Sequence, residues 1–99
     1  MRVVWTPLAE CHLDDIFRFI AESSPDYALR MIDRLTRRSQ QVGRFPESGR
    51  AVPEIGREAI REVFEGSYRL IYCIKATQVD VIAVIHASRL LRSDDLERP

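Results

Sequence analysis

The sequence contains almost no lysine and carries no net charge. Of its 15 basic residues only Lys75 is a lysine, the rest are arginines, and 15 acidic residues balance them. Proteins that neutralise many phosphates along a nucleic acid usually carry a clear excess of basic residues. The balance therefore argues against extended nucleic-acid binding, although it leaves a local basic patch open. Arginine also forms planar, bidentate hydrogen bonds that suit carboxylates and protein interfaces.

Long apolar runs and closely spaced cysteine pairs are also missing. No run reaches the roughly 18 residues that a membrane span needs, and the opening MRVVWTP lacks the apolar stretch of a signal peptide. Cys11 and Cys73 stand far apart, so we expect two free thiols and a cytoplasmic protein. The 99 residues, 45% of them hydrophobic, suffice for a single domain with one modest core.

The common catalytic and metal-binding signatures are absent as well. The chain has no GxSxG, GxxxxGK[ST], HExxH or CxxC motif. His12, His86 and the two cysteines do not have the spacing of zinc ligands, so we expect no metal site and no cofactor. His12 falls on or beside the apolar stripe of a predicted helix, which indicates a partly buried structural histidine.

Three short apolar runs in the second half of the chain predict an antiparallel meander. They are residues 60–64, 68–74 and 79–85, and the turn segments 65–67 and 75–78 separate them. The runs are rich in Val, Ile, Tyr and Phe, which favour strands, and such short links make neighbouring strands antiparallel. The middle run is apolar at alternate positions on both sides, which is typical of a strand buried on both faces.

Two amphipathic helices are predicted before the meander. One spans residues 7–23 with Thr6 as its N-cap, and the other spans residues 25–42 with Ser24 as its N-cap and Gly43 as its C-terminal cap. Their apolar stripes are Ala9, Leu13, Ile16 and Ile20 on the first helix and Ala28, Met31, Ile32, Leu35 and Val42 on the second. The link between the helices is very short, so they must form an antiparallel pair that can cover one face of the sheet.

The order of the elements predicts a two-layer α+β domain with the arrangement βααβββ. Residues 2–6 form the first strand, and the helical hairpin packs on one face of the antiparallel sheet. Residues 45–56 contain two prolines and two glycines and predict a loop, with Phe45 and Val52 turned inward. The polar tail, residues 90–99, is expected to be flexible within this single domain of residues 1–99.

Four residues in or at the ends of the predicted strands are candidates for binding or chemistry: Arg61, Arg69, His86 and Arg89. Arg69 lies in an otherwise apolar run, where a charge is costly unless it reaches solvent or a partner. His86 and Arg69 together could act on a phosphodiester, the histidine moving the proton and the arginine stabilising the developing charge. The structural alternative is that Arg69 pairs with a carboxylate such as Glu58 or Glu62, while His86 caps the end of its strand.

The sequence resembles the RelE/ParE toxin superfamily over residues 4–89. The segments WTPLAECHLDDIFRFI, FPESGR, REVFEGSYRLIYCI and VDVIAVIHASR carry the resemblance, and they follow the order found in the family. The resemblance implies a strand, two helices and then an antiparallel sheet, with the first strand beside the last. It also implies a type II toxin that is neutralised by an antitoxin protein.

The superfamily has two branches with different chemistry. RelE-like members cut messenger RNA in the ribosome, whereas ParE-like members inhibit DNA gyrase and have no known nuclease activity. Arg69, in YRLIY, occupies the position of a catalytic arginine of the nuclease branch, and it would act there with His86. The lysine cluster and C-terminal aromatic residue of that branch are missing, and the ending HASR, with His86 and Arg89, is similar to ParE. We therefore expect a gyrase inhibitor, with a ribosome-dependent endoribonuclease and an inactive binding module as the alternatives.

Overall fold

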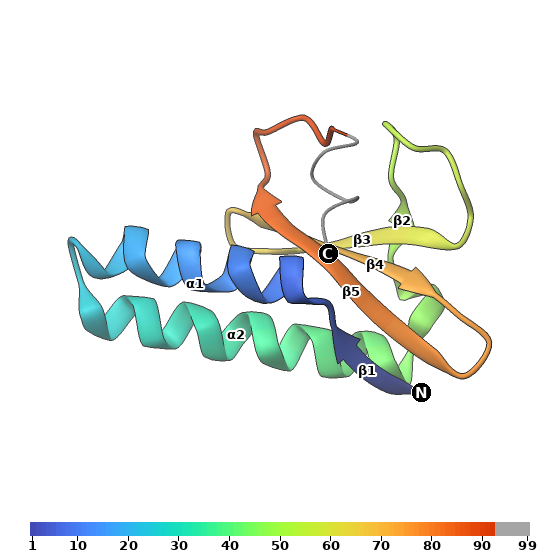
Figure 1. The fold of residues 1–99 in the computed structure, drawn as a ribbon, viewed down its shortest axis with the longest axis horizontal. Helices are drawn as coiled ribbons and strands as arrows, with labels where there is room; N and C mark the ends of the chain where they lie inside the picture. The colour runs from blue at the N-terminus through green and yellow to red at the C-terminus, as the bar shows by residue number, and fades with distance from the viewer. Residues whose placement is uncertain (93–99) are drawn as a thin grey trace.

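A helical hairpin packs on one face of a five-stranded sheet in the computed structural model, which describes residues 1–92 (Figure 1). The elements are β1 (Arg2–Trp5), α1 (Pro7–Ala21), α2 (Pro25–Arg44), the 3-10 helix η1 (Pro46–Ser48), β2 (Arg50–Ala51), β3 (Ile60–Glu65), β4 (Tyr68–Ile74) and β5 (Gln78–His86). The strand order is β1-β5-β4-β3-β2. The predicted two-layer α+β domain is confirmed, and β2 is a short edge strand within the segment that we expected to be a loop.

The first strand lies beside the last, as the family resemblance implied. β1 runs parallel to β5, with Arg2 opposite Gln78, whereas β3, β4 and β5 form the predicted antiparallel meander. A two-residue turn links β3 to β4, and Gly66 occupies it with a φ of 58°. Glycine adopts this left-handed conformation without strain, which explains the turn at this point of the sequence.

A β-bulge interrupts the pairing of β4 with β5. Ile71 lies opposite Ala83 and Tyr72 lies opposite Val81, so Ile82 has no partner residue on β4. Ile82 and Ala83 both pack in the apolar cluster on the face away from the helices. An extra residue of this kind shifts the alternation of the strand that follows it. Each side chain of β5 that follows the bulge therefore lies on the opposite face of the sheet from the one that regular alternation predicts.

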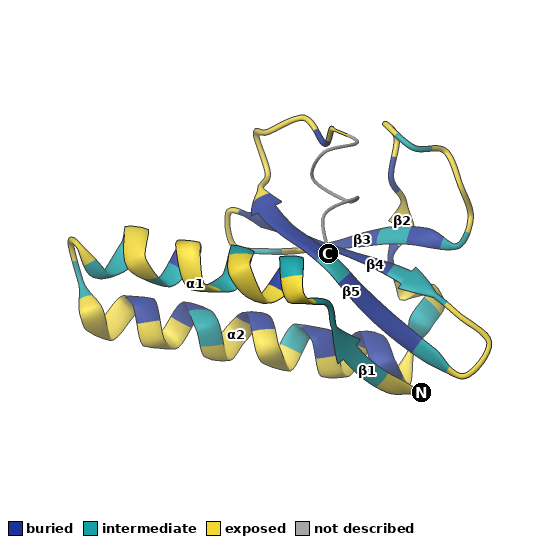
Figure 2. Cartoon of the chain, viewed as in Figure 1, coloured by how far each residue is buried: buried dark blue, intermediate teal, exposed yellow. Residues whose placement is uncertain are grey.

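Apolar clusters lie on both faces of the sheet. Beneath the helices the cluster includes Ala9, Ile16, Met31, Leu35, Val42, Val63, Tyr68, Leu70, Tyr72, Val79, Val81 and Val84. On the other face it contains Val52, Ile60, Ile71, Ala83, Ile85 and Leu91. β4 is thus buried from both sides, as its sequence predicts, and Figure 2 shows buried positions recurring along α2.

The predicted N-caps are confirmed, but both helices end elsewhere than expected. Thr6 Oγ1 accepts a hydrogen bond from the amide of Ala9, and Ser24 Oγ accepts one from the amide of Tyr27, each at 3.1 Å. These caps satisfy amide groups that have no partner within the helix. Helix α1 ends two residues earlier than predicted, and α2 continues two residues further, to Arg44.

Gly43 is not the C-terminal cap that we predicted. It lies within α2, where it is buried, and its carbonyl accepts a hydrogen bond of 2.7 Å from the amino group of Met1. A Cβ atom at this position would lie 2.6 Å from Cγ2 of Val3. This distance is shorter than a van der Waals contact, so any other residue at position 43 would force its neighbours to move. The glycine is therefore explained by the close approach of β1 to α2.

One of the two expectations about residues 45–56 was wrong. Val52 is fully buried as predicted, but Phe45 is 66% exposed, and the Phe45 amide caps the end of α2 by donating to the carbonyl of Gln41. In the tail, Leu91 is buried at 8% exposure and packs against the second cluster. The remainder of the expected flexible tail, residues 93–99, lies outside the described residues.

The two cysteines are free thiols at separate places in the fold. Cys11 is exposed on α1, and Cys73 is partly buried on β4. Within residues 1–92, neither helix has the length and apolar character that crossing a membrane requires.

Tyr72 provides a test of how η1 is held against the sheet. Its hydroxyl donates to the carbonyl of Pro46 at 2.6 Å and accepts from the amide of Gly49 at 3.0 Å. Replacing it with phenylalanine leaves both backbone groups without this partner, so Tyr72→Phe should lower the free energy of unfolding by about 1–3 kcal/mol. The control is Tyr68→Phe, because the Tyr68 hydroxyl makes no hydrogen bond within the described residues. Equal urea midpoints for the two variants would contradict this account.

Candidate functional site

Arg69 is held by two carboxylates in a partly buried ion-pair network. Its side chain is only 6% exposed. Nε donates to Oε1 of Glu62 at 2.7 Å, and Nη1 and Nη2 donate to the two oxygens of Glu54 at 2.9 and 3.0 Å. Arg50 donates to the other oxygen of Glu62 at 2.7 Å. Two arginines thus balance two glutamates, and the predicted pairing with Glu62, not Glu58, is the one formed.

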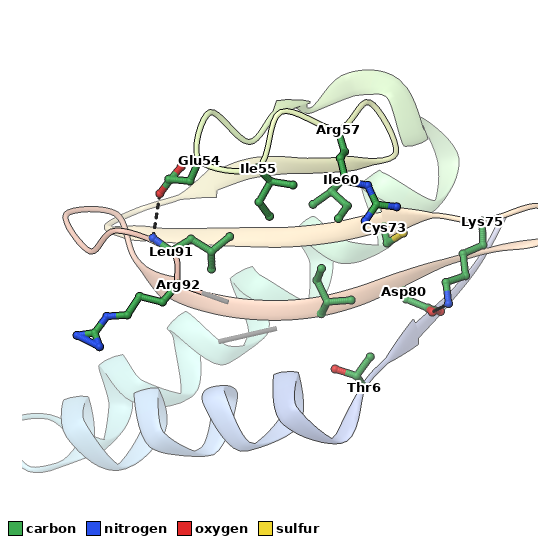
Figure 3. Close-up of a pocket in the computed structure, with 11 residues that line it drawn as sticks. Thr6, Glu54, Ile55, Arg57, Ile60, Cys73, Lys75, Asp80, Leu91 and Arg92 are labelled. Carbon is green, nitrogen blue, oxygen red and sulfur yellow. Dashed lines mark hydrogen bonds and ion pairs between the residues drawn. The ribbon is translucent and has the colours of Figure 1, made fainter. Parts of the chain in front are cut away.

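The same network ties the segment after β5 to the sheet. Nη1 of Arg69 also donates to the carbonyl of Arg89 at 2.9 Å. The amide of Leu91 donates to Oε2 of Glu54 at 2.9 Å, the dashed line in Figure 3. Hydrogen bonds to charged groups are stronger than those between neutral groups. They hold this segment where the Leu91 side chain reaches the second apolar cluster.

Glu54 is the member of the network that the sequence did not reveal. The hydrogen bond from Arg69, reinforced by that from the Leu91 amide, lowers the pKa of Glu54 from its ordinary 4.5 to about 2. The Glu54 hydrogen bonds in turn raise the pKa of Arg69. Glu54 lies 15 residues before Arg69 in an irregular segment, so no periodic pattern placed it beside β4. Only an unpaired arginine in an apolar strand signalled that some acidic partner was needed.

His86 closes the end of β5 on the opposite face. Its Nδ1 accepts a hydrogen bond from the amide of Ser88 at 3.2 Å and lies 2.7 Å from Oγ of Ser88. The ring packs edge-on against Tyr68, with the ring centroids 5.8 Å apart and an angle of 77° between the planes. These contacts agree with the structural alternative, in which His86 caps the strand end.

His86 and Arg89 line a shallow groove between α1 and the end of β5, which we call the α1–β5 groove. Its volume is about 320 Å³, and Phe19, 71% exposed on α1, forms part of its rim. β1 pairs with β5 only as far as Val81, so this part of the β5 edge has no neighbouring strand among the described residues. Here Nδ1 of His12 accepts the amide of Val84 at 3.1 Å, which makes His12 the structural histidine that its position predicted.

The structure does not bring Arg69 and His86 together. Arg69 lies opposite Ile85 and shares its face, where the second apolar cluster lies. His86 lies opposite Tyr68, which belongs to the cluster beneath the helices. The bulge at Ile82 is the cause, because regular alternation from Val79 would have turned His86 to the same face as Arg69. The two candidates for phosphodiester chemistry are therefore separated by the sheet.

Arg61 stabilises a loop and does not join either group. It lies opposite Tyr72, and its guanidinium donates to the carbonyls of Gly49 at 2.9 Å and Glu58 at 3.1 Å. The backbone carbonyl of Arg89 accepts a hydrogen bond from Arg69. In the part of the chain that is described, no three His, Cys, Asp or Glu side chains are grouped so that they could hold a metal ion.

Comparison with known proteins gives one family and one fold. Residues 3–91 match the family model of the ParE toxin of type II toxin–antitoxin system, parDE. A solved structure described as the chromosomal ParDE TA system from P. aeruginosa is similar with a TM-score of 0.74, at 15% sequence identity. The match covers 89% of this chain and 97% of that chain, and at this identity it shows a shared fold. No curated protein sequence matches.

The lowered pKa of Glu54 predicts a specific loss of stability in acid. Because the folded state binds this proton less readily than the unfolded state, stability should fall as the pH drops from about 4.5 towards 2. Glu54→Gln should cost about 1.5–3 kcal/mol at pH 7 and then lose less on acidification than the wild type. Urea unfolding at pH 7, 5, 4 and 3 measures both effects. Glu58→Gln, which alters an exposed glutamate of the same segment, should follow the wild type; a Glu54→Gln curve parallel to it would refute the assignment.

Proposed function

Because the chain belongs to the ParE toxin family of type II toxin–antitoxin systems, we propose that it inhibits DNA gyrase in the cytoplasm and is neutralised by its antitoxin. In this proposal the toxin binds gyrase and traps the complex of the enzyme with cleaved DNA. It acts through a protein surface and catalyses no reaction. The antitoxin is a protein that binds the toxin and prevents this contact.

The separation of Arg69 from His86 is the observation that supports inhibition over RNA cleavage. Cutting a phosphodiester requires a proton-transfer group and a positive charge at the same phosphate. His86 lies on the helix side of the sheet, whereas Arg69 lies on the other side. The donors of Arg69 are also directed to Glu54, Glu62 and a backbone carbonyl. An arginine with these partners offers little charge or hydrogen bonding to an RNA phosphate.

The overall charge favours the same function. The acidic and basic residues balance, 15 to 15. A nuclease that docks on ribosomal RNA would gain affinity from an excess of positive charge, because each neutralised phosphate releases a counterion. A protein inhibitor of a protein has no such requirement.

The α1–β5 groove is the surface that we propose for toxicity. It combines the exposed ring of Phe19 with His86 and Arg89, and large aromatic and arginine side chains are frequent at the centres of protein interfaces. The sequence candidates His86 and Arg89 both line this surface, and neither is required to transfer a proton. Arg61 and Arg69 have structural partners and position the loops around the sheet.

Inhibition of purified gyrase tests this proposal. DNA supercoiling should be blocked by the wild-type protein and by His86→Gln, since binding needs no proton transfer. Phe19→Asp should raise the inhibitory concentration at least tenfold, because it puts a charge at the rim of the groove. Leu29→Asp is the matched control, since Leu29 is an exposed apolar residue of α2, 61% exposed, that does not line the groove.

Expression in bacteria separates the alternatives. Filamentation with a DNA-damage response is expected for the wild type and for His86→Gln. Rapid arrest of translation, with ribosome-dependent cleavage of messenger RNA by purified protein that is lost in a folded His86→Gln variant, would instead establish the nuclease. Normal growth with no antitoxin present would indicate an inactive binding module.

A further inference from the structure

A second cavity of the described residues lies on the face of the sheet away from the helices. It has a volume of about 520 Å³ and lies between β4, β5, the loop before β3 and the segment after β5 (Figure 3). We call it the sheet-face pocket. Its apolar surface comes from Ile55, Ile60, Cys73, Ile82 and Leu91, all of which belong to or pack against the second apolar cluster. Among residues 1–92, nothing covers the second cluster at this pocket, whereas the helices cover the first cluster.

The charges around the pocket favour an anionic ligand. Both carboxylates of the lining are already paired: Glu54 with Arg69 at 2.9 Å, and Asp80 with Lys75 at 2.9 Å. Arg57 differs, because its guanidinium makes no hydrogen bond or ion pair with any described residue. It extends from the loop over the pocket, towards the strand that carries Cys73 (Figure 3). The pocket thus offers an apolar floor and one uncommitted cation beside it.

We propose that the sheet-face pocket binds an acidic segment of the antitoxin, with an apolar side chain on the floor and a carboxylate paired with Arg57. This inference rests on the proposed function, which supplies the antitoxin. A pocket of about 520 Å³ accommodates a few side chains and not a folded domain, so the ligand is a peptide segment. Arginine binds carboxylates in bidentate geometry, and the apolar floor supplies the burial that an exposed ion pair lacks.

Cys73 provides a direct reporter of occupancy. Its thiol lines the pocket and is partly exposed, so iodoacetamide should react with it in the free toxin. In the toxin–antitoxin complex its alkylation should slow at least tenfold, as measured by mass spectrometry of the separated peptides. Cys11, on α1, lies in a different peptide and shows whether any protection is general. Free toxin for the comparison is recovered from the complex by unfolding and refolding.

A charge reversal tests the role of Arg57. Arg57→Glu should weaken antitoxin binding at least tenfold by calorimetry at physiological salt. Arg44→Glu is the matched control, because Arg44 is an exposed arginine at the end of α2, outside the pocket. This variant makes the same change in net charge, so it measures the loss of long-range attraction between toxin and antitoxin. Equal affinity of the Arg57→Glu variant and the control, together with unprotected Cys73 in a stable complex, would overturn the inference and leave the proposed function intact. Failure to form any complex would count against the proposed function itself.

The sequence of this chain contains a second acidic segment that must be distinguished. Asp94, Asp95 and Glu97 flank Leu96 in the segment that follows Arg92. If Cys73 is already protected in the free toxin and becomes reactive in a chain that ends at Arg92, the occupant is the chain's own tail and the proposal is wrong. Equal reactivity of Cys73 in the two free proteins supports the antitoxin as the occupant.

Discussion

The ion pairs of Arg69 with Glu54 and Glu62 connect the segments that pack on the sheet face away from the helices. They connect β4 to β3, to the loop that precedes β3 and, through backbone groups, to the segment after β5. Among the described residues, no helix packs on this face of the sheet. A charge at this depth is tolerated only with its partners in place, so each segment must dock for the others to be stable. The burial of Val52 and Leu91 depends on the same arrangement.

This constraint also limits what Arg69 can do. The chemistry of an arginine depends on its neighbours and not on its place in the fold. Here two carboxylates occupy its donors. The bulge in β5 adds a second constraint, because it directs His86 to the helix side. A single extra residue in one strand thus separates a histidine and an arginine that lie only 17 positions apart in the sequence.

Much of the fold could be predicted from local patterns, because those patterns report burial directly. The stripes of both helices, the Thr6 and Ser24 caps and the three meander strands are local features. Gly43 was misread because a glycine near a helix end suggests a cap, whereas here it admits β1 at close range, a contact that forms across 40 residues. Phe45 was misread for a similar reason: a large ring in a loop usually seeks the core, but its place depends on where the backbone turns.

The site was less predictable than the fold. The sequence indicated that Arg69 needs either solvent or a partner, with Glu58 and Glu62 as candidates. Glu62 was within reach of prediction because β3 and β4 pair in a simple hairpin. Glu54 could not be found, since it lies in an irregular loop whose path depends on tertiary contacts. The bulge at Ile82 left no signal, because isoleucine and alanine fit either face of a strand. Counting alternate residues along β5 therefore gives the wrong face for His86.

A double-mutant cycle between Arg69 and Glu54 tests the central claim most directly. The free energies of unfolding of the wild type, Arg69→Met, Glu54→Gln and the double variant would be measured in urea at pH 7. If the pair holds the face together, the double variant should lose less stability than the sum of the single variants, with a coupling energy of about 1–3 kcal/mol. Additivity of the two losses within about 0.5 kcal/mol would show that Arg69 does not depend on Glu54, and would contradict the account.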